Sequence, residues 1–219
     1  MSLVLNVDAA QPEDKPMVLA AEVIQAGGVI VYPTETLYGI GANAWDGTAI
    51  AKVRAIKQRE GHKPILVVIK DEEQLAMLTN DISHEARTLI AKFWPGPLTL
   101  VFRATKEVPD ILSQGSGTIG VRIPSSPLCI KLLALCGCPL TSTSANLSGG
   151  PSLHTVKDIR RAIPRGVDLF LDAGDLHSAL PSTVLDVTVS PPRILREGVI
   201  SSALLRAVIP AIAEGGTSR

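Results

Sequence analysis

Apolar residues recur along the chain in two patterns that predict alternating strands and helices. Short apolar runs, often β-branched, indicate buried strands, and apolar residues spaced by three or four positions indicate amphipathic helices. The expected strands are 29–32, 65–69, 98–102, 118–123, 140–144, 169–172, 183–189 and 194–195. The expected helices are 17–26, one that begins at Asp46 and ends around 57–59, and then 72–78, 85–93, 128–135, 156–163 and 203–212.

The order of these elements predicts an α/β fold with a mixed sheet. Strands alternate with helices in the first half, which favours parallel pairing, whereas strands follow one another without helices between 168 and 196, which favours antiparallel pairing. The runs 29–32 and 65–69 are almost wholly apolar, so both faces of these strands should be covered. The expected organisation is an extension (1–15), one domain (16–200) and a C-terminal helix and tail (201–219).

The composition argues against several classes of protein. The 219 residues carry 21 Lys and Arg against 21 Asp and Glu, so a general attraction to polyanions is not expected. Aromatic residues make up only 3% of the chain, too few for the stacking surfaces of single-strand nucleic-acid binders. Three cysteines are too few for a disulfide scaffold. No apolar run reaches the roughly 18 residues of a membrane span, so we expect a cytoplasmic protein without a membrane segment.

The segment 52–63 concentrates positive charge. Its cations are Lys52, Arg54, Lys57, Arg59 and Lys63, against the single acid Glu60. Cations commonly complete a helix C-terminus, where each contributes about 0.3–1 kcal/mol. The alternative is a phosphate clamp, because arginine offers a planar fork and lysine a point charge to phosphate oxygens. A helix C-terminus repels phosphate, so side chains alone would have to hold the anion.

Two polar segments stand where predicted strands end. Residues 32–39 place hydroxyls and a carboxylate after a buried strand, at the edge where open α/β sheets bind ligands. Residues 141–144 are consecutive hydroxyl residues followed by Asn146 and two glycines, which offer many donors and acceptors with little bulk. Local turns and a helix cap are the structural alternative. The clustering of small hydroxyls favours a ligand site.

Arg122 is expected to face a sheet surface. It alternates with Val121 and Ile123 in a predicted strand, and an arginine in that position usually has an anionic partner. That partner is either a structural carboxylate or the carboxylate of a ligand. For Arg196 and Ser182 as well, the partner is either a structural group or a ligand.

Other motifs are weak or negative. Residues 39–44 match a relaxed dinucleotide fingerprint, but they lie too far beyond the preceding strand. The sequence contains neither a P-loop motif nor the nucleophile elbow of hydrolases. Cys129, Cys136 and Cys138 lack the spacing of a zinc site, so we expect buried free thiols.

Seven short motifs occur in order between about residues 20 and 198. They are 32–39 (YPTETLYG), Lys57-x-Arg59, 94–100 (WPGPLTL), Val121-Arg122-x-Pro124, 141–149 (TSTSANLSG), 181–184 (PSTV) and 195–198 (LREG). Together they resemble the YrdC-type threonylcarbamoyl-AMP synthase family. The resemblance implies a twisted open sheet of mixed parallel and antiparallel strands with flanking helices and a positively lined concave cavity. It also implies a nucleotidyltransferase that condenses L-threonine, bicarbonate and ATP into L-threonylcarbamoyladenylate and pyrophosphate.

The resemblance further implies roles for individual residues. The catalytic positions are Lys57, Arg59, Ser144 and Asn146. The ATP contacts are Arg59, Lys63, Thr118, Ser144, Ser152 and Arg196. The threonine contacts are Thr36, Arg122, Ser142 and Ser182, with Arg122 meeting the carboxylate. No metal ligand can be named, and magnesium is expected to arrive with ATP.

The implied product points to a second reaction. A separate transferase complex would use it to make threonylcarbamoyladenosine in tRNA, and the family is also described as binding RNA. The alternatives are a paralogue that serves another carbamoyl acceptor and a non-catalytic module that binds double-stranded RNA. Glu60 stands where proline is common in the family, and Val68 and Ser126 stand where histidines occur. These departures bear on substrate details more than on the fold.

Overall fold

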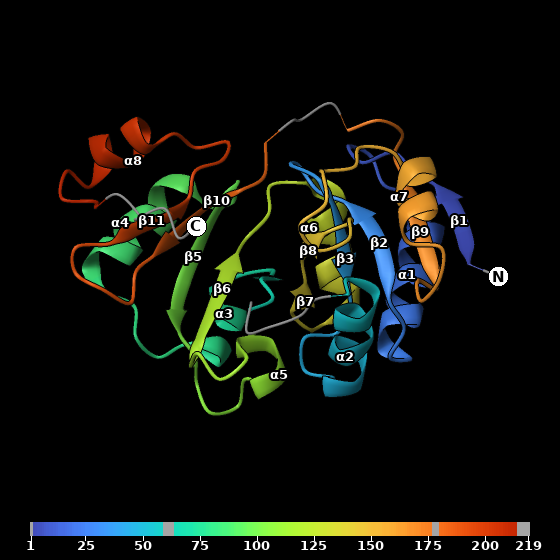
Figure 1. Cartoon of the computed structure of the whole chain (residues 1–219), viewed down its shortest axis with the longest axis horizontal. Coiled ribbons are helices and arrows are strands. Elements are labelled where there is room, and N and C mark those ends of the chain that lie inside the picture. The colour runs from blue at the N-terminus through green and yellow to red at the C-terminus, as the bar shows by residue number, and fades with distance from the viewer. Residues whose placement is uncertain (1, 59–63, 177–179, 214–219) are drawn as a thin grey trace.

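Two β-sheets with surrounding helices make up the described part of the chain, residues 2–58, 64–176 and 180–213, in the computed structural model (Figure 1). The helices are α1 (Asp14–Gln25), α2 (Gly47–Ile56), α3 (Glu72–Leu78), α4 (His84–Phe93), α5 (Asp110–Ser113), α6 (Pro127–Cys136), α7 (Val156–Ala162) and α8 (Ser202–Val208). The strands are β1 (Leu3–Asn6), β2 (Ile30–Pro33), β3 (Tyr38–Gly41), β4 (Val67–Val68), β5 (Leu98–Arg103), β6 (Thr118–Arg122), β7 (Leu140–Thr141), β8 (Thr143–Ser144), β9 (Leu169–Asp172), β10 (Thr183–Asp186) and β11 (Arg193–Arg196). The predicted mixed α/β fold is confirmed.

The first sheet has the strand order β1-β9-β2-β3-β8. The pairs β1/β9 and β9/β2 are parallel, and β2/β3 and β3/β8 are antiparallel. Helices α1 and α6 bury their apolar faces in one cluster with β2 and β9, while side chains of α2 and α7 pack with the opposite face. This sheet is therefore covered on both sides, as the apolar run of β2 predicts.

The second sheet has the strand order β11-β10-β5-β6-β4-β7. Its pairs β10/β5 and β4/β6 are parallel, and β10/β11, β5/β6 and β4/β7 are antiparallel. A single apolar cluster runs from β2 and β3 of the first sheet to β5 and β6 of the second. The two sheets therefore share a core.

Ser142 joins the two sheets. The predicted strand 140–144 is divided, because β7 ends at Thr141 in the second sheet and β8 begins at Thr143 in the first. Between them the Ser142 N–H donates to the Leu66 carbonyl at 2.8 Å. The run of hydroxyl residues thus crosses the junction of the sheets, and its side chains lie where the two halves of the molecule meet.

Two strands have no counterpart among the sequence predictions. Leu3–Asn6 pairs with β9 at the edge of the first sheet. Tyr38–Gly41 contains the glycines of the weak dinucleotide match, but they lie within a strand, under the ring of Tyr32. A Cβ on Gly41 would lie 2.6 Å from Tyr32 Cε1, so packing against the ring explains that glycine.

The described residues bear on the predictions about membrane spans and cysteines. There, no helix has both the length and the hydropathy needed to cross a membrane. The three cysteines are free; Cys129 and Cys136 are buried and Cys138 is partly buried, as predicted.

Candidate functional site

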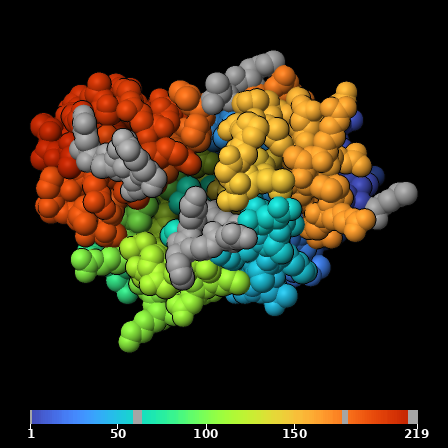
Figure 2. All heavy atoms as spheres, viewed as in Figure 1, coloured from blue at the N-terminus to red at the C-terminus, as the bar shows by residue number. Residues whose placement is uncertain are grey.

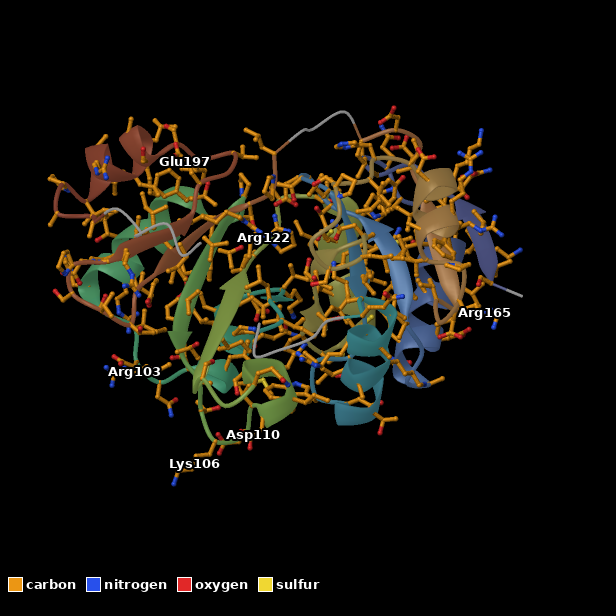
Figure 3. All side chains as sticks on the ribbon, in the orientation of Figure 1. Arg103, Lys106, Asp110, Arg122, Arg165 and Glu197 are labelled. Carbon is orange, nitrogen blue, oxygen red and sulfur yellow. The ribbon has the colours of Figure 1, made fainter. Side chains whose placement is uncertain are left out.

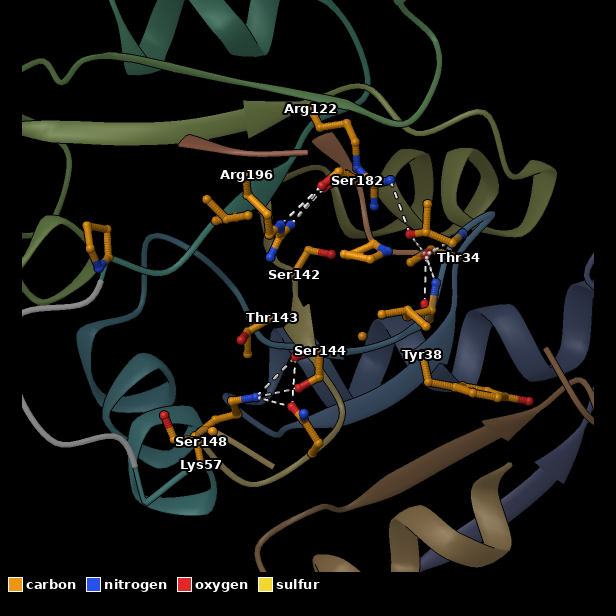
Figure 4. A pocket seen from close by; sticks show the side chains of 18 residues that line it. Thr34, Tyr38, Lys57, Arg122, Ser142, Thr143, Ser144, Ser148, Ser182 and Arg196 are labelled. Carbon is orange, nitrogen blue, oxygen red and sulfur yellow. Dashed lines mark hydrogen bonds between the residues drawn. The ribbon is translucent and has the colours of Figure 1, made fainter. Parts of the chain in front are cut away.

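A cavity of about 250 Å³ lies where the two sheets meet. Figure 2 shows the surface hollowed between the two halves of the molecule. The described residues of its wall are Thr34, Thr36, Leu37, Tyr38, Gly39, Lys57, Pro64, Leu66, Arg122, Ser142, Thr143, Ser144, Asn146, Ser148, Gly149, Pro181, Ser182 and Arg196 (Figure 4). The charged members of this set are Lys57, Arg122 and Arg196, all of them cations.

The turn between β2 and β3 supplies hydroxyls to the wall. Thr34 Oγ1 accepts the N–H groups of Thr36 and Leu37, each at 3.2 Å, and donates to the Leu37 carbonyl at 2.7 Å. The Oγ1 atoms of Thr34 and Thr36 are 3.0 Å apart. A side chain that closes its own turn in this way fixes the backbone. The turn therefore holds the Thr36 hydroxyl in place at the cavity.

Arg122 ends β6 and points into the space between the sheets, whereas Arg103 and Lys106 lie at the periphery (Figure 3). It is only 5% exposed. Its Nη1 donates to Glu35 Oε1 at 2.6 Å and to Thr36 Oγ1 at 3.5 Å. The anionic partner that the sequence required is thus a structural carboxylate from the β2–β3 turn.

Lys57 follows α2 at its C-cap and is 3% exposed. Its Nζ donates to the Ser144 carbonyl at 2.6 Å and to Asn146 Oδ1 at 2.8 Å. Ser144 Oγ donates to the same Oδ1 at 2.7 Å, and Asn146 Nδ2 donates to the Gly150 carbonyl at 2.7 Å. The lysine of the basic segment and the serine–asparagine pair of the hydroxyl segment therefore form one hydrogen-bonded group, visible in Figure 4.

Arg196 ends β11 and lies over Ser182. Its Nη2 donates to the Ser182 carbonyl at 2.9 Å and to Ser182 Oγ at 3.3 Å. Ser182 Oγ is 2.9 Å from Thr99 Oγ1, which ties this corner to β5. Burial lowers the pKa of Arg196, and the charge of Arg122 lowers it further. The two guanidinium groups are therefore close enough to repel each other.

Four predicted site residues are not among the described wall residues of the cavity. Arg59 and Lys63 lie outside the described residues, as does Glu60. Thr118 begins β6 at the end away from Arg122, with its Oγ1 2.9 Å from Ser116 Oγ. Ser152 lies between β8 and α7. Neither Thr118 nor Ser152 belongs to the described wall of the cavity, so their contacts with ATP stay predictions.

Comparison with known proteins identifies the family. The sequence-family model of the Sua5, YciO and YrdC proteins, described as "Telomere recombination", matches residues 22–198. The chain belongs to this family. The resemblance inferred from the seven motifs is thereby confirmed.

Relatives in the Sua5/YrdC family match nearly the whole chain. A threonylcarbamoyl-AMP synthase of Pyrococcus abyssi is 35% identical over 212 residues, which are 97% of this chain and 62% of the relative. The chain thus spans less than two thirds of that protein. A putative threonylcarbamoyl-AMP synthase of Mycobacterium tuberculosis is also 35% identical, over 92% of this chain and 94% of the relative.

Solved structures of the family share the fold. The crystal structure of P. abyssi Sua5 complexed with L-threonine has a TM-score of 0.93 and 34% identity, covering 98% of this chain and 63% of that one. The crystal structure of E. coli YciO has a TM-score of 0.86 and 31% identity, covering 94% of this chain and 100% of that one.

The departures from the family pattern have local explanations where they are described. Ser126 caps α6, since its Oγ accepts the Cys129 N–H at 3.4 Å. Val68 is buried in β4 with the cluster of α1 and α6. Glu35 received no role from the sequence, although it lies between the wall residues Thr34 and Thr36 in the chain, and only the fold reveals its pairing with Arg122.

Proposed function

We propose that the chain is a threonylcarbamoyl-AMP synthase, a nucleotidyltransferase that condenses L-threonine, bicarbonate and ATP into L-threonylcarbamoyladenylate and pyrophosphate. The observation that carries the proposal is that one cavity brings Arg122 and Thr36 together with the Lys57–Ser144–Asn146 group. The names of the curated relatives and the threonine-bound structure of a relative support it.

The reaction needs two bond-forming steps. The amine of threonine joins the carbon of bicarbonate to give a carbamate and water. A carbamate oxygen then attacks the α-phosphorus of ATP, and the bond to the β-phosphate oxygen breaks to release pyrophosphate. Cations and hydroxyls dominate the polar part of the described wall, so the work of the protein is to align the reactants and to offset negative charge.

We assign the two substrates to different parts of the cavity. Arg122 binds the carboxylate of threonine, with the hydroxyls of Thr36, Ser142 and Ser182 around it. On the nucleotide side we propose the wall residues Lys57, Ser144, Asn146 and Arg196. The family resemblance adds Arg59, Lys63, Thr118 and Ser152. Lys57 and Arg196 would offset charge that develops on the phosphates.

Magnesium would reach the cavity as part of the ATP complex. No group of three or more His, Cys, Asp or Glu side chains among the described residues could hold a metal ion. Bound with ATP, magnesium supplies charge neutralisation of the phosphates, which is its general role in phosphoryl chemistry. We therefore treat it as a component of the substrate.

The product is a reactive mixed anhydride that a second enzyme must consume. We propose that a tRNA threonylcarbamoyl transferase complex in the cytoplasm uses it to make threonylcarbamoyladenosine, and that RNA binding by this chain is a secondary property.

The test is pyrophosphate release with all three substrates and with each omitted in turn. We expect release only with the complete set, and a loss of about 100-fold or more in Lys57→Met, because a donor to developing charge is removed. Lys52→Met is the matched control on α2, the helix that Lys57 follows, since Lys52 Nζ donates to the Gly27 carbonyl away from the cavity. Turnover that needs a different amine in place of threonine would indicate a paralogue. Salt-sensitive binding of duplex RNA without turnover would indicate a binding module.

A further inference from the structure

Glu35 is a carboxylate paired with the wall residue Arg122; it does not itself belong to the described wall of the cavity and has no role in the proposed chemistry. It stands between Thr34 and Thr36, which both line the cavity, in the turn that the Thr34 hydroxyl fixes. Its side chain is 16% exposed, and its Oε1 accepts the hydrogen bond from Arg122 at 2.6 Å. The negative charge is therefore held against the arginine that faces the substrate.

Only one of its two oxygens is satisfied. Oε2 is buried and has no hydrogen-bond partner among the described residues. A buried polar atom without a partner is costly, and its persistence calls for an explanation. Inside a protein the low local dielectric also makes a charge act more strongly on its neighbours. The charge of this half-satisfied carboxylate therefore favours a cationic group over an anionic one in the part of the cavity next to Arg122.

The charges of the cavity are distributed unevenly. Arg196 hydrogen-bonds to the neutral oxygens of Ser182, and no carboxylate of the described residues forms an ion pair with it. Arg122 lies near enough to lower the pKa of Arg196, yet its own charge is offset by Glu35. An anion such as phosphate is thus drawn to Arg196 more strongly than to Arg122.

We propose that Glu35 makes the Arg122 end of the cavity selective for an amino-acid zwitterion over phosphate and simple carboxylates. The inference rests on the proposed function and deepens it. An α-amino acid carries a negative and a positive group side by side, which complements the adjacent Arg122 and Glu35. Glu35 attracts the ammonium group of the amino acid and repels anions that lack one. The amino acid is thereby directed to Arg122, and phosphate groups are directed to the neighbouring Arg196.

The experiment compares two ligands in three proteins by titration calorimetry. The ligands are L-threonine and 3-hydroxybutanoate, which is threonine without its ammonium group; the proteins are wild type, Glu35→Gln and the remote control Glu22→Gln. Wild type and the control should prefer threonine. In Glu35→Gln that preference should fall about tenfold or more, because threonine binds less tightly while 3-hydroxybutanoate binds as tightly or more tightly. Glu35→Asp keeps the charge and should keep most of the preference.

Other outcomes of these titrations would overturn the inference. If Glu35→Gln weakens both ligands by the same factor, Glu35 only positions Arg122 and the inference is wrong; an unchanged preference also overturns it. Circular dichroism checks that each variant is folded. Should Glu35→Gln not fold, inorganic phosphate serves with the wild type: it should raise the KM for ATP and leave the KM for threonine unchanged, and competition with threonine overturns the inference. Wild type that releases no pyrophosphate from the three substrates contradicts the proposed function separately, whichever ligand it prefers.

Discussion

Two arginines face the same cavity, but the chain holds them in opposite ways. Arg122 is fixed by an ion pair with Glu35, which lies in a turn of the other sheet. Arg196 is fixed by neutral oxygens of Ser182, on the neighbouring segment of its own sheet. An arginine paired with a carboxylate is well positioned, but its charge is already offset. An arginine anchored by neutral oxygens keeps its charge for a ligand, so one residue type provides two neighbouring positions of different net charge in one cavity.

The largest expected effect is the loss of stability when the Arg122 end is broken. Arg122→Gln removes the cation and leaves the Glu35 carboxylate buried without its partner, a change that costs about 3–5 kcal/mol in comparable pairs. Urea denaturation should show this as a fall in the free energy of unfolding. The double variant Arg122→Gln/Glu35→Gln should recover most of the loss, because no buried charge remains. Equal losses in the single and double variants would mean that the ion pair is not what stabilises this end.

The contrast between the arginines shows how far sequence reasoning reaches. The alternation around Arg122 predicted a partner with negative charge, and the clustering of small hydroxyl residues at 141–144 predicted a ligand site. The sequence could not predict that Glu35 is this partner, because Glu35 and Arg122 are 87 residues apart in the chain and lie at different sheets. Local pattern specifies what a side chain requires, and long-range pairing decides which residue provides it.

The same distinction applies to the fold. The apolar runs identified most strands of the shared core, since burial on both faces leaves a clear signal. Tyr38–Gly41 was missed because two glycines that accommodate the Tyr32 ring interrupt the apolar pattern. The sequence did not predict that 140–144 is divided at Ser142 between the two sheets. Hydroxyl residues stand on both sides of Ser142, so the residue pattern does not change where the chain passes from one sheet to the other.

A smaller effect is expected when the anchor of Arg196 is displaced. Gly198 packs against the backbone of Pro181 and Ser182, and a Cβ there would clash with the Pro181 carbonyl oxygen and lie 2.7 Å from the Ser182 carbonyl carbon. Gly198→Ala should therefore cost about 1–3 kcal/mol in unfolding free energy, as overpacking does, and should raise the KM for ATP. Gly47→Ala is the control, because a Cβ at Gly47 meets no atom within 4 Å. If Gly198→Ala has the unfolding free energy and the KM for ATP of the wild type, the backbone of Pro181 and Ser182 shifts readily to accommodate the added methyl group.

Arg196 itself offers a more selective comparison with Arg122. Arg196→Gln leaves no carboxylate of the described residues without a partner, so stability should change little. The KM for ATP should rise about tenfold, corresponding to about 1.4 kcal/mol of lost binding. Arg196→Lys keeps the charge but loses the planar fork, so its KM for ATP should lie between those of wild type and Arg196→Gln. If the KM for threonine rises as much as that for ATP, the two ends do not act separately.

The smallest effect concerns the thiol behind the Arg122 end. Burial raises the pKa of Cys129 to about 12, and the negative charge of Glu35 contributes to the rise. The thiol also donates to the Pro33 carbonyl at 3.3 Å, at the start of the Glu35 turn. Since the thiolate is the reactive form, Cys129 should react very slowly with Ellman's reagent at pH 8 in the folded protein.

Cys138 provides the internal comparison for that measurement. It is less buried, with a pKa raised by burial to about 11, so it should react first, and Cys138→Ser should remove the fastest phase. Glu35→Gln should speed the reaction of Cys129 only slightly, because burial is the larger cause of its raised pKa and is unchanged. In denaturing urea all three thiols should react at similar rates. Fast reaction of Cys129 in the folded protein would show instead that the turn carrying Glu35 opens, and that the carboxylate is less firmly held against Arg122 than its 2.6 Å hydrogen bond indicates.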